Sequence, residues 1–392
     1  MQPANGMLCC DNAPIMTDSI DKLLNYHLQT GRYPGAVVHI ERDGAVLKHV
    51  SVGRLRGDGD APMREDAIFR IASLTKPLVT TAAMQLNEAG QLELDAPVHR
   101  YLPELADLRM PGGTAPRRQP SVRDLMRHSS GFSYLNEYRD AASREIAMQV
   151  GLDMRLATMT REQVLQALAA LPLGCEPGHG FRYGFSTDVL GLVIERVTSR
   201  NLGDVLHERI FAPLGMHDTG FALPAQARAR MAGAYPDDAG FFAFTGKFDE
   251  GATKGDAIQS GGGGLVSTLP DYLRFARTLV GGGALGAVRI LSEDSLAEMT
   301  RDQLGEAVDG PTNLTGPGFG FGLGFAVRHD FGVSAFPTFP GEITWSGICG
   351  PVMYVHPRER TIALSFNCNM ATRILARMEF RRAAQPLFDS AA

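Results

Sequence analysis

The fold of this chain is decided by the stretch FRIASLTKPLVTTAAMQL, residues 69–86, in which a short apolar strand runs directly into a helix. Residues 67–72, AIFRIA, have the composition of a strand. Beyond them, Leu78, Ala82 and Leu86 recur at helical spacing, and Gly90 is a natural end for the helix. Ser73 is therefore expected where a strand meets the N-terminus of a helix.

The same stretch places a hydroxyl and an amine three residues apart, at Ser73 and Lys76. One helical turn brings both side chains to the same face. A serine hydroxyl is a poor nucleophile near neutral pH, and an adjacent lysine serves as its base once the environment lowers the lysine pKa. The N-terminus of the helix also offers backbone N–H groups, including that of Ser73, to a developing oxyanion. Ser19 and Lys22 show the same spacing, but there we interpret the serine as a helix cap and the lysine as solvated.

The segments before this stretch predict a helix followed by a hairpin. Thr17 and Asp18 are candidate caps for an amphipathic helix, and its apolar residues follow at helical spacing. Residues 36–42 and 45–53 are strand-like and flank Asp43-Gly44, a dipeptide that tolerates the positive φ of a two-residue turn. An antiparallel hairpin is expected here.

The segments after it mix helical patterns with glycine- and proline-rich connections. Helices are expected at 121–128, 161–171, 187–198, 202–211 and 270–280. Residues 236–264, including the glycine run 261–264, are interpreted as a flexible connection. Strands return at 320–327, 342–348, 351–357 and 361–367, before a closing helix. We predict a discontinuous α/β domain made of residues 1–92 plus 325–392, with a mostly helical inserted domain at 93–324.

Composition excludes several classes of function. Of the 392 residues, 44% are hydrophobic and 21% are charged, which is typical of a folded globular protein. The net charge of -5 gives no footprint for nucleic acid, and no apolar stretch is long enough to span a membrane. The first residues lack the pattern of a secretory leader, so a cytoplasmic location is expected. Five cysteines and ten histidines show no metal-site spacing, so neither a metal nor a cofactor is expected.

Further motifs give the chain a family resemblance. They occur in the order SVRDLMRHSSGFSY (121–134), FRYGFSTDVLGLVIERV (181–197), PLGMHDTGF (213–221) and GGGGLVSTLPDYLRFARTL (261–279). Together with Ser73-Leu74-Thr75-Lys76, they make the chain similar to the serine β-lactamase and penicillin-binding-protein superfamily. It most resembles the family VIII carboxylesterases, which are similar to class C β-lactamases. The resemblance implies an α+β, β-lactamase-like fold, with an antiparallel sheet built from both termini and flanked by helices.

The resemblance also implies roles for residues that spacing alone does not single out. The family's Tyr-x-Asn motif is matched by Tyr183-Gly184-Phe185, so Tyr183 is expected to handle protons together with Lys76. Phe185 stands where the family has the asparagine that hydrogen-bonds β-lactam side chains. That replacement disfavours β-lactamase activity.

The family's Lys-Thr-Gly motif is matched by Trp345-Ser346-Gly347. An indole in place of an ammonium removes a charge that binds substrate carboxylates and supplies an apolar wall. Trp345 and Phe185 are therefore expected to line the substrate site, and the backbone N–H of Ile348 to pair with that of Ser73 as the oxyanion hole. His128, inside the HSSGF motif, is expected to be structural and to hydrogen-bond a turn.

The sequence therefore predicts a serine carboxylesterase that hydrolyses uncharged, short-chain esters through an acyl-enzyme on Ser73. No G-x-S-x-G motif supports a Ser-His-Asp hydrolase instead. The alternatives are a β-lactamase or D-amino peptidase, an acyltransferase that uses the same residues, and a non-catalytic binding protein on this scaffold. The expected partner is a small-molecule ester, and the oligomeric state stays open.

Overall fold

The central sheet is built from both ends of the chain. The computed structural model describes residues 19–222, 224–305 and 312–390. Its largest sheet has seven strands in the order β2-β1-β11-β10-β9-β8-β7, and all neighbouring pairs are antiparallel. The strands are β1 (Gly35–Arg42), β2 (Ala45–Gly53), β7 (Phe319–Phe321), β8 (Ala326–Arg328), β9 (Ile343–Ser346), β10 (Val352–His356) and β11 (Thr361–Asn367). The predicted antiparallel sheet from both termini is confirmed.

The first hairpin forms as local sequence predicts. Asp43 and Gly44 have φ values of 51° and 78°, so both adopt the left-handed conformation that a two-residue turn requires. β1 pairs with β2 on one side and with β11 on the other. This strand is buried along nearly its whole length.

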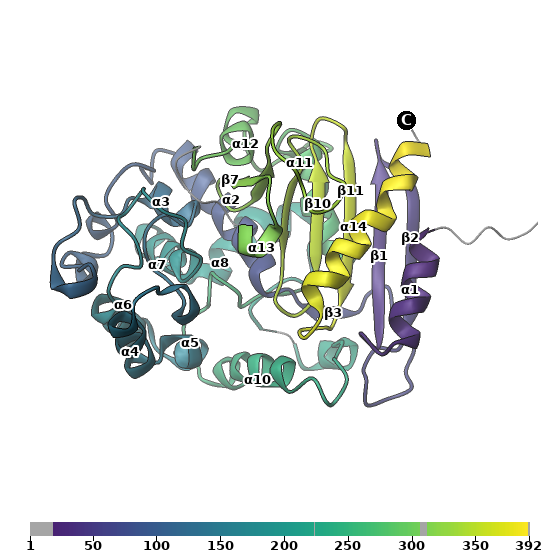
Figure 1. Ribbon diagram of the computed structural model, residues 1–392, viewed down its shortest axis with the longest axis horizontal. Coiled ribbons are helices and arrows are strands. Elements are labelled where there is room, and N and C mark those ends of the chain that lie inside the picture. The colour runs from purple at the N-terminus through teal and green to yellow at the C-terminus, as the bar shows by residue number, and fades with distance from the viewer. Residues whose placement is uncertain (1–18, 223, 306–311, 391–392) are drawn as a thin grey trace, which may run out of the picture.

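Helices cover both faces of the sheet (Figure 1). On one face, α1 (Ser19–Gln29) packs against α14 (Arg373–Ser390), which contacts β11. On the other, α11 (Leu269–Val280) contacts β1, β10 and β11. The predicted first and closing helices are present, whereas the cap candidates Thr17 and Asp18 lie outside the described residues.

A buried ion pair connects α14 to the residue that precedes β9. Arg381 is 0% exposed and Glu342, directly before β9, is 1% exposed. The Arg381 guanidinium donates from Nε and a terminal nitrogen to the Glu342 carboxylate, with a shortest N–O distance of 2.7 Å. Two fully desolvated charges are thus neutralised by each other.

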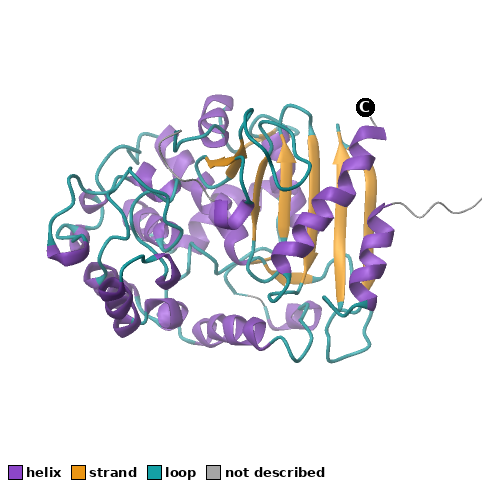
Figure 2. Cartoon of the chain, in the orientation of Figure 1, coloured by secondary structure: helices purple, strands orange, loops and turns teal. Residues whose placement is uncertain are grey.

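The helical region lies beside the sheet (Figure 2). Its helices are α2 (Thr75–Glu88), α3 (Val122–Met126), α4 (Ala141–Val150), α5 (Leu152–Arg155), α6 (Arg161–Ala170), α7 (Ser186–Thr198), α8 (Leu202–Leu206), α9 (Ala212–Leu214), α10 (Ala239–Thr253), α12 (Glu293–Thr300) and α13 (Thr312–Thr315). α10 corrects the interpretation of 236–264 as a connection. The Asp238 carboxylate caps this helix by accepting from the Phe241 N–H at 3.0 Å, and its glycines hide the apolar pattern from the sequence.

Two predicted strands pair differently from expectation. Residues 320–327 form a hairpin of β7 and β8 instead of one strand, because Gly324 turns the chain with φ 90°. β3 (Ile68–Arg70) pairs with β4 (Val266–Thr268) in a separate two-stranded sheet. β7 belongs to the large sheet although it lies inside the range 93–324. The division into two domains stays a prediction.

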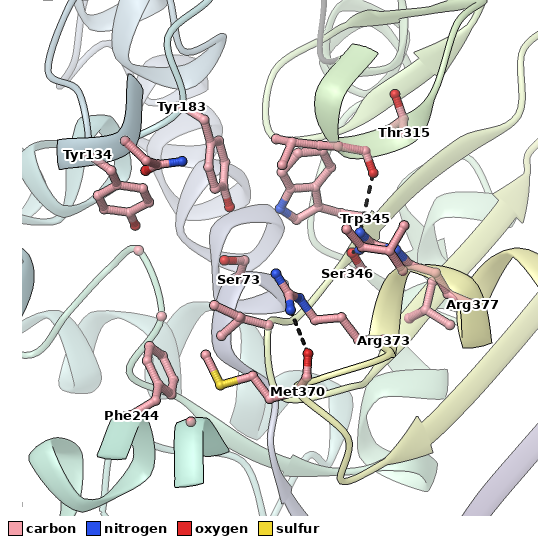
Figure 3. Close-up of a pocket in the computed structure, with 18 of the residues that line it drawn as sticks. Ser73, Tyr134, Tyr183, Phe244, Thr315, Trp345, Ser346, Met370, Arg373 and Arg377 are labelled. Atoms are coloured by element: carbon pink, nitrogen blue, oxygen red, sulfur yellow. Dashed lines mark hydrogen bonds between the residues drawn. The ribbon is translucent and has the colours of Figure 1, made fainter. Parts of the chain in front are cut away.

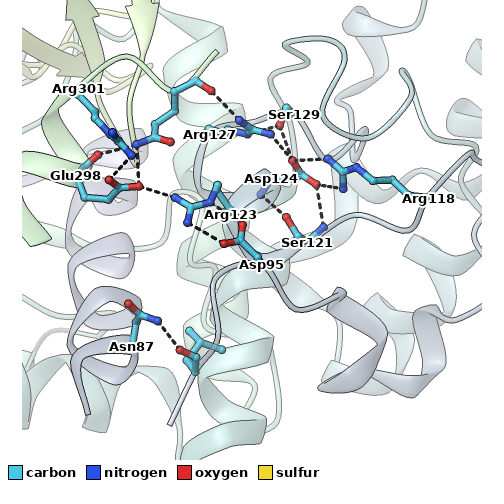
Figure 4. A network of polar contacts seen from close by, with 12 residues as sticks. Asn87, Asp95, Arg118, Ser121, Arg123, Asp124, Arg127, Ser129, Glu298 and Arg301 are labelled. Carbon is cyan, nitrogen blue, oxygen red and sulfur yellow. Dashed lines mark hydrogen bonds and ion pairs between the residues drawn. The ribbon is translucent and has the colours of Figure 1, made fainter. Parts of the chain in front are cut away.

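A polar network fixes the segment that carries the HSSGF motif (Figure 4). Asp124 is fully buried, and its carboxylate accepts from Arg118, Arg127, the Ser129 hydroxyl and the Ser121 N–H. Burial acts to raise the pKa of Asp124, but these hydrogen bonds outweigh it and hold the pKa below its ordinary value. The network anchors the turn that follows α3.

Candidate active site

Ser73 lies in a short 3-10 helix, Ala72–Leu74, that leads into α2. Ala72 has a φ of 44°, a strained conformation for a residue with a side chain. Gly347, just after β9, packs against this turn so closely that a Cβ there would lie 2.3 Å from the Ile71 carbonyl oxygen. The strained turn at the candidate nucleophile is thus held by a segment from the other end of the chain.

Lys76 lies directly beneath Ser73 and is 0% exposed. Its Nζ donates to the Ser73 Oγ at 3.1 Å and to the Gly262 carbonyl oxygen at 2.6 Å. It also lies 4.7 Å from the centroid of the Tyr183 ring. The predicted pair of hydroxyl and amine is therefore in hydrogen-bond contact, and the phenol lies beside it.

Tyr183 precedes α7 and is half-buried. In Figure 3 its hydroxyl points toward Ser73. Its ring packs against that of Trp345 at a centroid distance of 5.3 Å and against that of His128 at 4.7 Å. Ser73 and Tyr183 thus line one cavity, and the buried Lys76 amine contacts both of them.

Two backbone N–H groups beside the hydroxyl have no partner. Among the described residues, neither the Ser73 N–H nor the Ile348 N–H donates a hydrogen bond to another protein group. Both residues line the same cavity, and β9 contacts the 3-10 helix that carries Ser73. Free N–H groups at this place are suited to binding an oxyanion.

The cavity has a volume of about 730 Å³ and mostly apolar walls. Trp345 is 4% exposed, and no group in the described part of the chain accepts a hydrogen bond from its indole N–H. Phe185 is buried and meets the ring of Tyr134 edge to face at 4.8 Å. Both predicted wall residues line the cavity, together with Phe244, Phe248 and Met370.

His128 differs from the expectation that it hydrogen-bonds a turn. Its imidazole is buried, and its Nδ1 has no partner among the described residues. Burial lowers the His128 pKa well below its ordinary value, and the positive charge of Lys76 adds to the effect. The imidazole is therefore neutral and acts by packing its ring against that of Tyr183.

The glycine run 261–264 is not a flexible connection, because it packs closely on neighbouring groups. A Cβ on Gly261 would lie 2.5 Å from the Thr187 carbonyl oxygen, and one on Gly262 would lie 2.3 Å from the Asp188 Oδ2. Only glycine permits this approach to α7. The run of glycines resembles a flexible connection in the sequence, but in the fold the glycines serve close packing.

Four residues that line the cavity were not predicted from the sequence. Tyr134 and Asp188 lie inside quoted motifs, whereas Arg373 and Arg377 of α14 had no signal beyond helical spacing. Arg377 donates to the Ser346 hydroxyl and to the Leu314 carbonyl oxygen. Burial lowers the pKa of both arginines, and in the described ranges their hydrogen bonds go to carbonyl and hydroxyl oxygens and not to a carboxylate.

The part of the chain that the structure describes holds no cluster of three or more histidine, cysteine or carboxylate side chains arranged for a metal ion. Within it, no helix combines the length and apolarity needed to cross a bilayer.

Comparison with known proteins gives consistent matches. The family model described as Beta-lactamase matches residues 20–378. Esterase EstB of Burkholderia gladioli is 32% identical over 378 residues, which covers 90% of each chain. The solved structure of EstCE1, a hydrolase with promiscuous acyltransferase activity, has a TM-score of 0.78 and 28% identity, covering 93% of this chain and 97% of that one. Simvastatin synthase from Aspergillus terreus has a TM-score of 0.75 at 23% identity, covering 94% of this chain and 98% of that one, and so shares the fold.

Proposed function

Since this chain belongs to the Beta-lactamase family, we propose that it acts as a serine carboxylesterase with Ser73 as its nucleophile. The chain is a serine hydrolase, and its likeness to EstB and EstCE1 supports an ester as substrate. The observation that carries the proposal is the 3.1 Å hydrogen bond between the Lys76 Nζ and the Oγ of Ser73, which lines an apolar cavity. A buried amine in contact with a hydroxyl is an arrangement for activating a nucleophile.

The proposed reaction proceeds in two halves. Lys76 and Tyr183 together take the Ser73 proton, and the oxygen forms a bond to the ester carbonyl carbon. The oxyanion is held by the N–H groups of Ser73 and Ile348, which contribute about 3 kcal/mol each to transition-state stabilisation. Collapse breaks the bond to the alcohol oxygen, and Tyr183 returns the proton to it. Water then attacks the acyl-enzyme through the same groups and releases the carboxylic acid and free Ser73.

The proposed substrates are uncharged esters with short acyl chains. Trp345 presents an apolar ring beside Tyr183, and an apolar group of the substrate is favoured against this part of the wall. Phe185 adds bulk at the cavity wall, which favours a short acyl chain. A cytoplasmic location stays a prediction.

We expect p-nitrophenyl butyrate to be hydrolysed with a kcat/KM about 10²-fold higher than that of nitrocefin. Phe185 offers no hydrogen bond to the side-chain amide of a β-lactam, and an unsatisfied amide costs about 1–3 kcal/mol. Both reactions are followed by absorbance on one enzyme preparation. Faster turnover of nitrocefin would reverse the assignment in favour of a β-lactamase.

Acyl transfer to an alcohol is a second candidate, because EstCE1 is described as a hydrolase with promiscuous acyltransferase activity. The same acyl-enzyme serves both reactions, and the acceptor decides between them. Chromatography of the products formed from vinyl butyrate in the presence of 1-butanol measures the partition. A butyl ester as the main product would make transfer the principal activity.

The Tyr183→Phe variant is expected to lose about 10²–10⁴-fold in kcat, as is typical when a general acid–base group is removed. The ring contacts with Trp345 and His128 remain, so KM should change little. Steady-state kinetics on p-nitrophenyl butyrate measure both constants. Phe181→Leu, which alters a neighbouring ring of the same cluster, is the control. An equal loss of kcat in that variant would mean that ring packing, and not the Tyr183 hydroxyl, accounts for the effect.

A further inference from the structure

We propose that Asp188 is a positioning residue for this reaction, and that it acts on Lys76 through the backbone of Gly262. The inference rests on the proposed function, because it concerns the base that activates Ser73. Asp188 lies on α7, five residues beyond Tyr183, and lines the same cavity as Ser73. Its side chain is 2% exposed.

A continuous set of hydrogen bonds connects the carboxylate to the ammonium. The Asp188 Oδ1 accepts from the Gly262 N–H at 3.0 Å and from the Ser260 hydroxyl at 2.6 Å. The carbonyl oxygen of Gly262 then accepts from the Lys76 Nζ at 2.6 Å. One residue is thus held at its N–H by the anion and at its carbonyl by the cation. The carboxylate thereby determines where the Gly262 oxygen lies, and this oxygen determines where the Lys76 amine lies relative to Ser73.

The absence of a side chain at position 262 is part of the same arrangement. The Asp188 Oδ2 occupies the space that a Cβ on Gly262 would fill, at 2.3 Å. The backbone therefore approaches the carboxylate as closely as its atoms permit. A side chain at this position would displace the Asp188 carboxylate and with it the hydrogen bond that holds the Gly262 N–H.

Asp188 also supplies a negative charge near the buried ammonium of Lys76, which has no carboxylate in direct contact with it in the described ranges. Across the described ranges, the Lys76 Nζ donates to the Ser73 Oγ and the Gly262 carbonyl oxygen and to no carboxylate. Burial raises the pKa of Asp188, while the positive charge of Lys76 opposes that rise. The other titratable groups that face this pair are the phenols of Tyr183 and Tyr134 and the neutral imidazole of His128. Asp188 is the anion among them.

The Asp188→Asn variant separates charge from shape. The amide oxygen still accepts from Gly262 and Ser260, but the negative charge is gone. The neutral amine of Lys76 and the phenolate of Tyr183 then both become easier to form. Whichever of the two takes the Ser73 proton, the acidic limb of the kcat/KM profile is expected to move about one pH unit lower. We also expect kcat at the optimum to fall about tenfold with less than a twofold change in KM, because a neutral amide oxygen holds the Gly262 N–H less strongly than a carboxylate and so positions the Lys76 amine less firmly.

Asp271→Asn is the matched control. The Asp271 carboxylate is also buried, and it accepts from one backbone N–H, that of Asp218, and from one hydroxyl, that of Thr219. It lies on α11, outside the residues that line the cavity. The control is expected to keep the wild-type pH profile. An equal shift in Asp271→Asn, or an unshifted profile in Asp188→Asn, overturns the proposal.

Ser260→Ala keeps the proposal testable if Asp188→Asn does not fold. This variant removes one hydrogen bond to the carboxylate, so the anion is less stabilised and the acidic limb should move in the same direction by a smaller amount. An unchanged profile here, with Asp188→Asn unfolded, also counts against the proposal. Wild-type enzyme without activity on p-nitrophenyl butyrate would instead contradict the proposed function, which distinguishes the two failures.

Discussion

The Ser73→Ala variant is expected to lose about 10⁶-fold in kcat on p-nitrophenyl butyrate, the scale found when a serine nucleophile is removed from a hydrolase. Alanine removes the oxygen that forms the acyl-enzyme, and Lys76 and Tyr183 then have no proton to take. The cavity and the two free N–H groups remain, so binding should change little. The measurement is steady-state hydrolysis corrected for the uncatalysed rate.

Covalent labelling locates the nucleophile independently of rate. A fluorophosphonate should add one label to the wild-type protein, on the peptide that contains Ser73, and none to Ser73→Ala. Ser19→Ala is the control, because Ser19 has the same spacing to a lysine but donates its hydroxyl to the Ala383 carbonyl on α14. Intact mass and peptide mapping decide the matter. A label on Ser19 or another serine would refute the assignment.

The Arg381→Met variant is expected to lower the free energy of unfolding by about 3–5 kcal/mol, because it leaves the buried carboxylate of Glu342 without its partner. Burial raises the pKa of Glu342 even in the intact protein. Without the arginine, folding favours the protonated carboxyl further. The stability that the protonated Glu342 carboxyl provides is lost as the pH rises through its folded-state pKa. The free energy of unfolding of the variant should therefore be lower at pH 8 than at pH 5. Urea unfolding at both values measures this.

A double variant distinguishes the lost partner from the lost side chain. The double variant, Arg381→Met combined with Glu342→Leu, has no charge at either position. It should recover most of the lost free energy of unfolding, since no unpaired charge is then buried. Arg200→Met removes one member of an exposed ion pair with Glu208 and should leave the unfolding midpoint unchanged. If the double variant is no more stable than Arg381→Met, the loss comes from packing.

The parts of the fold that depend on nearby residues were predictable from the sequence. Asp43-Gly44 specifies its turn through its own conformational preferences, and the spacing of apolar residues indicated α1, α6 and α11. Pairings between distant segments were not predictable in this way. The sequence of β3 predicts a strand but not its partner, because β4 lies almost two hundred residues further along the chain. α10 was missed because its glycines resemble a connection, while its stability comes from the apolar face and the Asp238 cap.

In the candidate site too, contacts between residues close in sequence were predictable and contacts between distant segments were not. The contact between Ser73 and Lys76 follows from their spacing at the start of one helix, whereas Tyr183, Trp345 and Ile348 were predicted only through family resemblance. Asp188 was missed because its importance depends on a glycine that packs on it from another segment. The catalytic roles of all these residues stay predictions until the variants are measured.

The strand order has a consequence for how the protein is made. β1 lies between β2 and β11, so the hairpin that leaves the ribosome early waits for a partner encoded about 300 residues later. At roughly 5–20 residues per second, translation leaves that apolar edge uncovered for tens of seconds. During this interval the nascent chain is exposed to intermolecular β-pairing, and chaperones that bind extended apolar segments have time to act. Nascent chains that stall before residue 361 would display an open edge and contain no completed cleft.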